Sequence, residues 1–148
     1  MRNRDAQDAR VAEILGDRLD NDECTFEDCV DAFYKHLGNA LQLPCDVTGI
    51  EDFRWEEFYI FGPGNKEEYE HLRQTQPSYK DIFELMAIET DVYGEWIMCS
   101  GEDVAAHVRR KSDGKEFYLG LSEIKAVDKT SLNHQLIYDY AVWFVNNR

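Results

Sequence analysis

The chain has 148 residues, of which 43% are hydrophobic and 13% aromatic, which suits one domain with a real core and excludes a long disordered protein. Its formal net charge is −14, from 30 acidic and 16 basic residues. Such a surface repels nucleic acid and anionic membranes, so we expect neither as a partner. It attracts metal cations and basic proteins.

Four cysteines, Cys24, Cys29, Cys45 and Cys99, occur without a C-x-x-C pair, so zinc binding is not indicated. The first ten residues are charged or polar and carry no signal-peptide pattern, and no apolar run approaches the length of a membrane span. We therefore expect a cytoplasmic protein whose cysteines are reduced and mostly packed.

The chain opens with a charge-rich stretch, residues 1–24, which we predict to be an N-terminal extension. Val11, Ile14, Leu15 and Leu19 recur in it at helical spacing, which predicts a short helix.

Residues 25–148 are expected to form a single α+β domain that begins with an amphipathic helix. Thr25 is suited to cap this helix, and Asp28 lies near its positive end. Pro44 prevents the helix from continuing. Its apolar stripe consists of Phe26, Val30, Phe33, Leu37 and Leu41.

A strand and an acidic segment follow the helix. Residues 45–50 alternate as a strand, residues 51–57 are expected to form a loop, and residues 58–61 look like a second short strand. Asn65 is placed to cap a short helix, with Glu68 in the capping-box position.

The rest of the chain is predicted to consist mainly of strands. Residues 82–88 and 104–110 have strand patterns, residues 122–127 suggest a short helical or bent connection, and residues 138–145 look like a final aromatic strand. Helices early and strands late predict an α+β fold. In it, N-terminal helices pack on a small, bent antiparallel sheet, for which an SH3-like partial barrel is one possible form.

Ser112-Asp113-Gly114 is a strong hairpin turn signal between two of these strands. The only basic run, Arg109-Arg110-Lys111, adjoins this turn. We interpret it as a solvated strand end, with a latch on an acidic loop as the alternative.

The acidic segment holds four carboxylates within seven residues: Glu51, Asp52, Glu56 and Glu57. Like charges crowded in this way cost free energy unless a cation or a basic group neutralises them. Calcium takes roughly six to eight oxygen ligands in irregular geometry, so these residues are candidate ligands. Other acidic residues could approach the segment: Asp46, Asp91, Glu95, Glu102 and Asp103.

Two explanations without metal stay open: the carboxylates can be solvated, or Arg54 can pair with one of them. An EF-hand, however, is excluded. A loop starting at Asp20 would place Cys24 and Thr25 at the fifth and sixth positions, where the sixth must be glycine, and Asp31 at the twelfth in place of glutamate.

Five segments carry a family resemblance: LPCDVTGIEDFRWEEFYIFG, Glu67-Glu68-Tyr69, Pro77-Ser78-Tyr79, VRRKSDGKEFYLGLSEIKAVD and DYAVWFVNNR. They resemble the cyanobacterial calcium-binding protein family, the CcbP-type proteins. The resemblance runs from about Leu43 to Arg148 and does not cover the residues before Thr25. It implies a small acidic protein that binds calcium through surface carboxylates and buffers or senses it in the cell.

Carried onto matching positions, the resemblance implies a set of ligand carboxylates, with Asp52 as the best candidate, followed by Glu51, Glu56, Glu57, Asp128 and Asp139. We thus predict a calcium buffer or sensor whose ligand is Ca²⁺. No nucleophile-and-base motif or phosphate loop is present, so we do not expect an enzyme. The alternative is an acidic interaction module that inhibits a basic partner or mimics its ligand.

Overall fold

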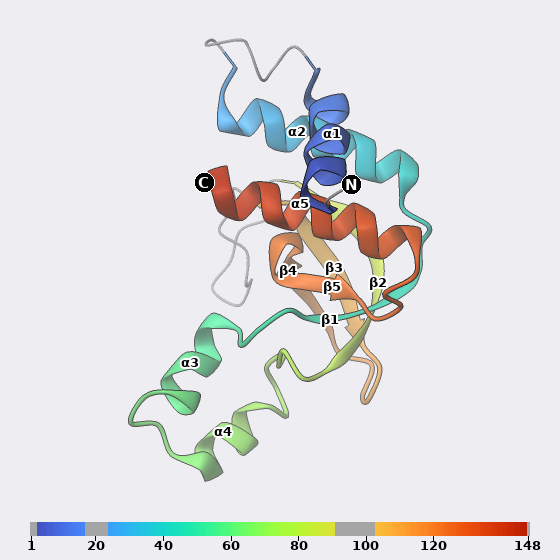
Figure 1. The fold of residues 1–148 in the computed structure, drawn as a ribbon. Helices are drawn as coiled ribbons and strands as arrows, with labels where there is room; N and C mark the ends of the chain where they lie inside the picture. The colour runs from blue at the N-terminus through green and yellow to red at the C-terminus, as the bar shows by residue number, and fades with distance from the viewer. Residues whose placement is uncertain (1–2, 17–23, 91–102, 148) are drawn as a thin grey trace.

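An antiparallel sheet forms the centre of the molecule (Figure 1), whose computed structural model describes residues 3–16, 24–90 and 103–147. In this part of the chain the strand order is β4-β3-β2-β1-β5, so β4 and β5 are the edges and the sheet is open. The strands are β1 (Cys45–Gly49), β2 (Ile82–Glu89), β3 (Ala105–Arg110), β4 (Glu116–Gly120) and β5 (Ile124–Ala126).

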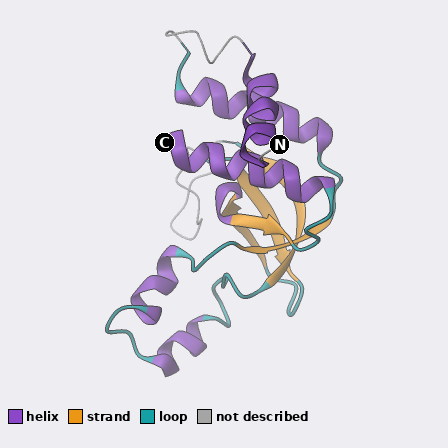
Figure 2. Cartoon of the chain, viewed as in Figure 1, coloured by secondary structure: helices purple, strands orange, loops and turns teal. Residues whose placement is uncertain are grey.

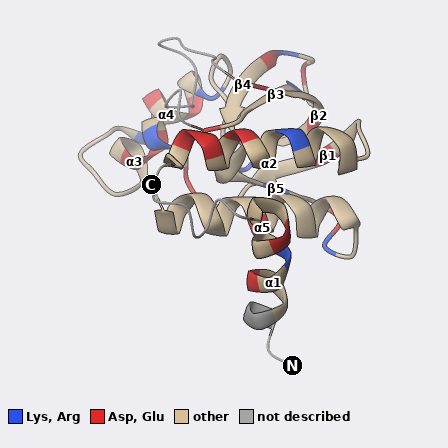
Figure 3. Ribbon diagram, turned by 90° about the horizontal axis from the view of Figure 1, so that it is seen from above, with Lys and Arg blue, Asp and Glu red and all other residues tan. Residues whose placement is uncertain are grey.

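The helices divide into two groups (Figure 2). Helices α2 and α5 cover one face of the sheet, and α1 packs on both of them (Figure 3). Helices α3 and α4 are inserted between β1 and β2 and lie away from this body; we call residues 50–81 the lobe. The helices are α1 (Asn3–Leu15), α2 (Phe26–Ala40), α3 (Arg54–Ile60), α4 (Lys66–Leu72) and α5 (Leu132–Asn147), with a short 3-10 turn, η2 (Leu121–Glu123).

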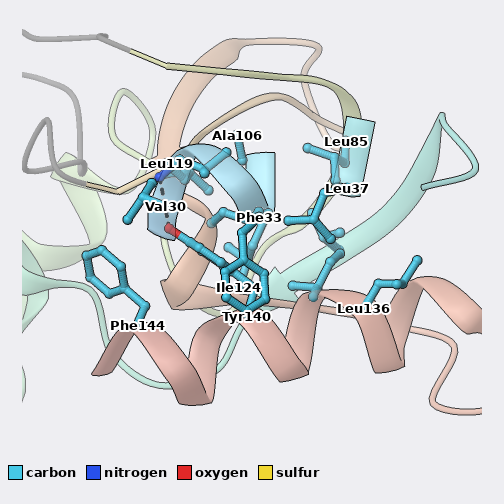
Figure 4. Packing of buried hydrophobic residues seen from close by; sticks show 14 of the residues in the cluster. Val30, Phe33, Leu37, Leu85, Ala106, Leu119, Ile124, Leu136, Tyr140 and Phe144 are labelled. Carbon is cyan, nitrogen blue, oxygen red and sulfur yellow. Dashed lines mark hydrogen bonds between the residues drawn. The ribbon is translucent and has the colours of Figure 1, made fainter. Parts of the chain in front are cut away.

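The core lies between the sheet and the helices α2 and α5 (Figure 4). Alternate strand residues point into it, and they meet the apolar stripes of the two helices, whose buried side chains recur every three or four residues. Burying each large apolar side chain contributes roughly 1.5–3 kcal/mol. The fully buried members include Phe33, Leu37, Val47, Phe83, Leu85, Val108, Leu119, Ile137 and Tyr140.

Several predicted elements are confirmed, and with them the α+β class. Thr25 caps α2 in a capping box, in which the Asp28 amide donates to Thr25 Oγ1 at 3.1 Å and the Thr25 amide donates to Asp28 Oδ2 at 3.0 Å. The β3–β4 hairpin turns at Gly114, whose φ of +77° lies in the left-handed region that glycine adopts without strain. The SH3-like partial barrel is not confirmed.

Two predicted strands are wrong, because both segments are helical. Residues 138–145 lie in α5: their aromatic content favours strands, but the buried Ile137, Tyr140 and Phe144 recur at helical spacing. Residues 58–61 belong to α3 and its C-terminal cap, so Glu56 and Glu57 lie on a helix rather than a loop.

The connection predicted over residues 122–127 consists of the end of η2 and the short strand β5. Leu19, which completed the predicted stripe of the first helix, lies outside the described residues. Among the helices described, none has the length and apolar character needed to cross a bilayer.

Candidate functional site

The acidic segment forms the bend after β1 and the first turn of α3. Glu51 and Glu57 are exposed, and Asp52 is half-buried. Within residues 3–16, 24–90 and 103–147, the structure gives these three carboxylates no hydrogen bond and no ion pair. Arg54 likewise forms no ion pair with a described carboxylate, so the segment is not neutralised from within. Three acidic side chains are therefore available to a ligand.

Glu56 differs from its neighbours because its carboxylate is fully buried. Oε1 accepts hydrogen bonds from the amides of Phe53 (3.3 Å) and Tyr79 (2.8 Å). Oε2 accepts from the hydroxyls of Tyr69 (2.6 Å) and Ser78 (2.8 Å). We call these five residues the Glu56 network. It joins the start of α3, the middle of α4 and the segment that leads into β2.

Aromatic side chains pack around the Glu56 network. Trp55 lies 5.6 Å from Tyr69 between ring centroids, and its Nε1 donates to the carbonyl of Pro77 at 2.6 Å. Burial and the hydrogen bond to Glu56 raise the pKa of Tyr69 to about 12. The Tyr69 hydroxyl thus stays protonated and donates at physiological pH. The lobe has an ordered interior of its own, and Phe53 connects it to the main core.

Arg110 fixes the other end of the lobe and was not expected from the sequence to be buried. Its guanidinium is 3% exposed and donates to both oxygens of Asp113, at 3.0 and 2.7 Å, and to Asp81 at 3.1 Å. It also donates to three carbonyls that follow α4, those of Arg73, Gln74 and Gln76. The basic run therefore does not consist only of solvated residues, because Arg110 holds the end of the lobe, in agreement with the alternative interpretation of this run. In the sequence, the acidic Asp113 three residues later is the local partner that could have indicated this role.

Asp139 lies in the middle of α5, in a different part of the molecule from the acidic segment (Figure 1). It is buried and forms a two-point ion pair with Arg10 of α1, at 2.7 and 3.0 Å. Gln7 also donates to it at 3.0 Å. Its oxygens are thus occupied in holding α1 to α5.

Asp128 is exposed on the connection between β5 and α5. Its Oδ1 accepts from the amide and the hydroxyl of Thr130, at 3.0 and 2.7 Å, and these bonds lower the pKa of Asp128. Asp128 therefore organises the turn that begins α5.

The other described acidic residues that we considered as ligands, Asp46 and Asp103, have partners outside the acidic segment. Asp46 pairs with Lys111 at 3.1 Å on the outer face of the sheet. Asp103 is buried, where it accepts from Ser122 and Tyr140, and burial raises the pKa of Asp103. Asp91, Glu95 and Glu102 lie outside the described residues. In the part that the structure describes, no three His, Cys, Asp or Glu side chains converge as a ready metal site.

No family model and no curated protein matches the sequence. Two solved structures share its architecture. The crystal structure of Anabaena CcbP matches with a TM-score of 0.57 and 17% identity, covering 97% of this chain and 93% of its own. A calcium binding protein in the calcium-binding form matches with a TM-score of 0.55 and 17% identity, covering 99% and 97%. The chain therefore has the fold of the CcbP-type proteins that its segments resemble.

Proposed function

We propose that this chain binds Ca²⁺ through carboxylates of the acidic segment and acts as a calcium buffer or sensor. The observation that carries the proposal is that the four carboxylates of that segment differ in burial and in hydrogen bonding. Glu56 is committed to the lobe interior, whereas Glu51, Asp52 and Glu57 flank it without a described partner. The fold shared with a protein solved in its calcium-binding form supports the same conclusion.

The donor chemistry of these residues fits calcium. Their carboxylates are hard oxygen ligands at positions that water can reach, and calcium accepts irregular sets completed by backbone carbonyls and water. Magnesium requires stricter octahedral geometry, so a site on a bend favours calcium. Because no such site is ready-made among the described residues, the side chains of Glu51, Asp52 and Glu57 have to gather around the ion.

Three of the predicted ligands have structural roles in this proposal. Glu56 and Asp139 would each have to give up buried hydrogen bonds to reach an ion, which costs free energy. Asp128 holds the turn before α5. We therefore assign binding to Glu51, Asp52 and Glu57.

The connections of the lobe favour a buffer over a sensor. The Glu56 and Arg110 hydrogen bonds hold both ends of the lobe before any ion binds. A sensor rearranges its helices on binding, whereas a buffer changes little.

Calorimetry of the metal-free protein tests the assignment. Asp52→Asn removes one anionic ligand, so we expect calcium affinity to fall by about tenfold or more, equivalent to roughly 1.4 kcal/mol. Asp8→Asn, an exposed carboxylate on α1, is the matched control and should leave the affinity unchanged. Equal affinities of the two variants would remove Asp52, and no binding by the unaltered protein would refute the function.

A further inference from the structure

The end of α3 presents two exposed aromatic side chains at the outer end of the lobe. Phe61 is 75% exposed and Phe58 is 53% exposed. They lie three residues apart, and therefore on the same side of the helix, and Pro63 follows in the next turn. We call Phe58, Phe61 and Pro63 the lobe tip. Exposed apolar groups that gather in this way commonly mark an interaction surface.

These two rings lie at the edge of the packed part of the lobe and stay largely exposed. The aromatic cluster of the lobe consists of Trp55, Tyr59 and Tyr69, and Phe58 touches it only through a T-shaped contact with Tyr59, at 5.0 Å between ring centroids. Neither Phe58 nor Phe61 belongs to the main core or packs against it. Both could be polar without loss of a described core contact. Their apolar character therefore calls for a partner outside the chain.

The lobe tip is also held in place. The Gly64 amide donates to the Phe58 carbonyl at 3.1 Å, and the Phe61 amide donates to the Glu57 carbonyl at 3.0 Å. A Cβ at Gly64 would lie 2.9 Å from Phe58 Cδ1 and 2.5 Å from Tyr59 Cδ1, so the turn backbone packs directly against the rings of Phe58 and Tyr59. A surface fixed in this way loses little conformational entropy when a partner binds.

Exposed acidic residues precede and follow the lobe tip along the chain. From residue 54 to residue 70 the chain has five acidic and two basic residues, and of these acids only Glu56 is buried. The exposed carboxylates are Glu57, Glu67, Glu68 and Glu70. An apolar centre with an acidic rim is complementary to a segment with an apolar stripe and flanking lysines or arginines.

We propose that the lobe tip is the docking site for a basic amphipathic helix of a partner protein. The net charge of −14 disfavours a second copy of this chain and an anionic membrane as occupants. The proposal does not rest on calcium binding: Glu51 and Asp52 precede α3, whereas the lobe tip lies at its end. Of the residues that we assign to calcium, only Glu57 also belongs to the acidic rim, and the aromatic side chains of the lobe tip are separate from all three.

Fluorescence anisotropy tests the proposal with a labelled helical peptide of leucine and lysine, its leucines at helical spacing. The double variant Phe58→Ser/Phe61→Ser should bind about tenfold more weakly or worse than the unaltered chain. Leu132→Ser, which alters a 51% exposed residue on α5, is the control and should bind as the unaltered chain does. Added salt should weaken the complex, and the same peptide with glutamate for lysine should not bind.

The proposal is overturned if the lysine peptide does not bind, or if the double variant and the control bind it equally well. It is also overturned if the protein binds phosphatidylcholine vesicles more strongly than it binds the peptide. A dimer in sedimentation that the double variant abolishes would assign the lobe tip to a second copy instead. Calcium affinity and near-ultraviolet circular dichroism of the double variant should match those of the unaltered protein, which shows that the lobe is folded and separates this test from that of calcium binding.

Discussion

Two buried charged side chains of opposite sign hold the lobe. The Glu56 carboxylate accepts four hydrogen bonds, and the Arg110 guanidinium donates to two carboxylates and three carbonyls. Neither group could stay buried without these partners, because a desolvated charge is costly unless it is fully compensated. The same bonds that make the burial tolerable fix where the lobe leaves the sheet.

Glu56→Gln should destabilise the protein, because the amide nitrogen of glutamine cannot accept from the donors that now face one of the carboxylate oxygens. We expect the free energy of unfolding to fall by about 2–4 kcal/mol, measured by urea denaturation. Glu57→Gln, one residue away and exposed, should change it by less than about 0.5 kcal/mol. Similar losses in both variants would contradict the role assigned to the Glu56 network.

Asp113 provides a prediction about pH. Hydrogen bonds from Arg110 lower the pKa of Asp113 from its ordinary value of 3.8 to about 2. A carboxyl with a lowered folded-state pKa stabilises the fold above its unfolded pKa, and this contribution is lost as pH falls from about 4 towards 2. The difference in unfolding free energy between the unaltered protein and Asp113→Asn should therefore be constant from pH 7 to 5 and shrink below pH 4.

Urea denaturation of both proteins across that range provides the measurement. Because the two share every other carboxyl group, the difference isolates Asp113 from the general acid titration. A difference that stays constant down to pH 3 would show that the pairing with Arg110 does not stabilise the fold.

At the scale of elements, α1 is attached to the body by a polar cluster around Asp139 and by apolar side chains, among which Val11 and Ile14 pack against the core. Asp139 of α5 binds Arg10 and Gln7, and Leu15 at the end of α1 is fully buried. Asp139 was proposed as a ligand because an aspartate in a matching segment looks the same whether it is exposed or paired. Its partner lies 129 residues away, a separation that no local pattern reveals.

A double-mutant cycle of Arg10→Gln and Asp139→Asn measures this attachment. Arg10 is 36% exposed at its side chain whereas Asp139 is 4% exposed, so solvent screens the pair only in part. We expect a coupling free energy of about 1–2 kcal/mol from urea denaturation. A coupling near zero would mean that the apolar packing of Val11, Ile14 and Leu15, rather than this ion pair, holds α1.

The elements also show what local patterns can and cannot predict. Helix α2 and the β3–β4 hairpin have caps and turn residues that act within a few positions, and both were predicted correctly. The strands predicted over residues 58–61 and 138–145 are wrong, because aromatic residues favour strands but these residues lie at the end of α3 and within α5. What makes α3 helical includes Glu56, whose bond to the Phe53 amide is local but whose other partners lie on distant segments.

At the scale of the whole molecule, the order of helical and strand patterns along the sequence predicted the α+β class, and the resemblance alone implied the CcbP-type fold. It also predicted which carboxylates are crowded along the chain, but not which are committed elsewhere. That depends on burial and on distant donors, as Glu56 and Asp139 show. The assignment of Glu51, Asp52 and Glu57 to calcium stays a prediction.

The insertion point of the lobe has a consequence for how this architecture can diversify. Thr48 of β1 pairs with Ile82 of β2, so the chain departs from and rejoins the sheet on adjacent antiparallel strands. A hairpin of this kind needs only a tight turn to close, and the cost of lengthening a loop grows slowly with its length. The lobe can therefore be shortened, extended or replaced while the register of β1 and β2 is kept. This makes the lobe the region where new binding specificities can arise.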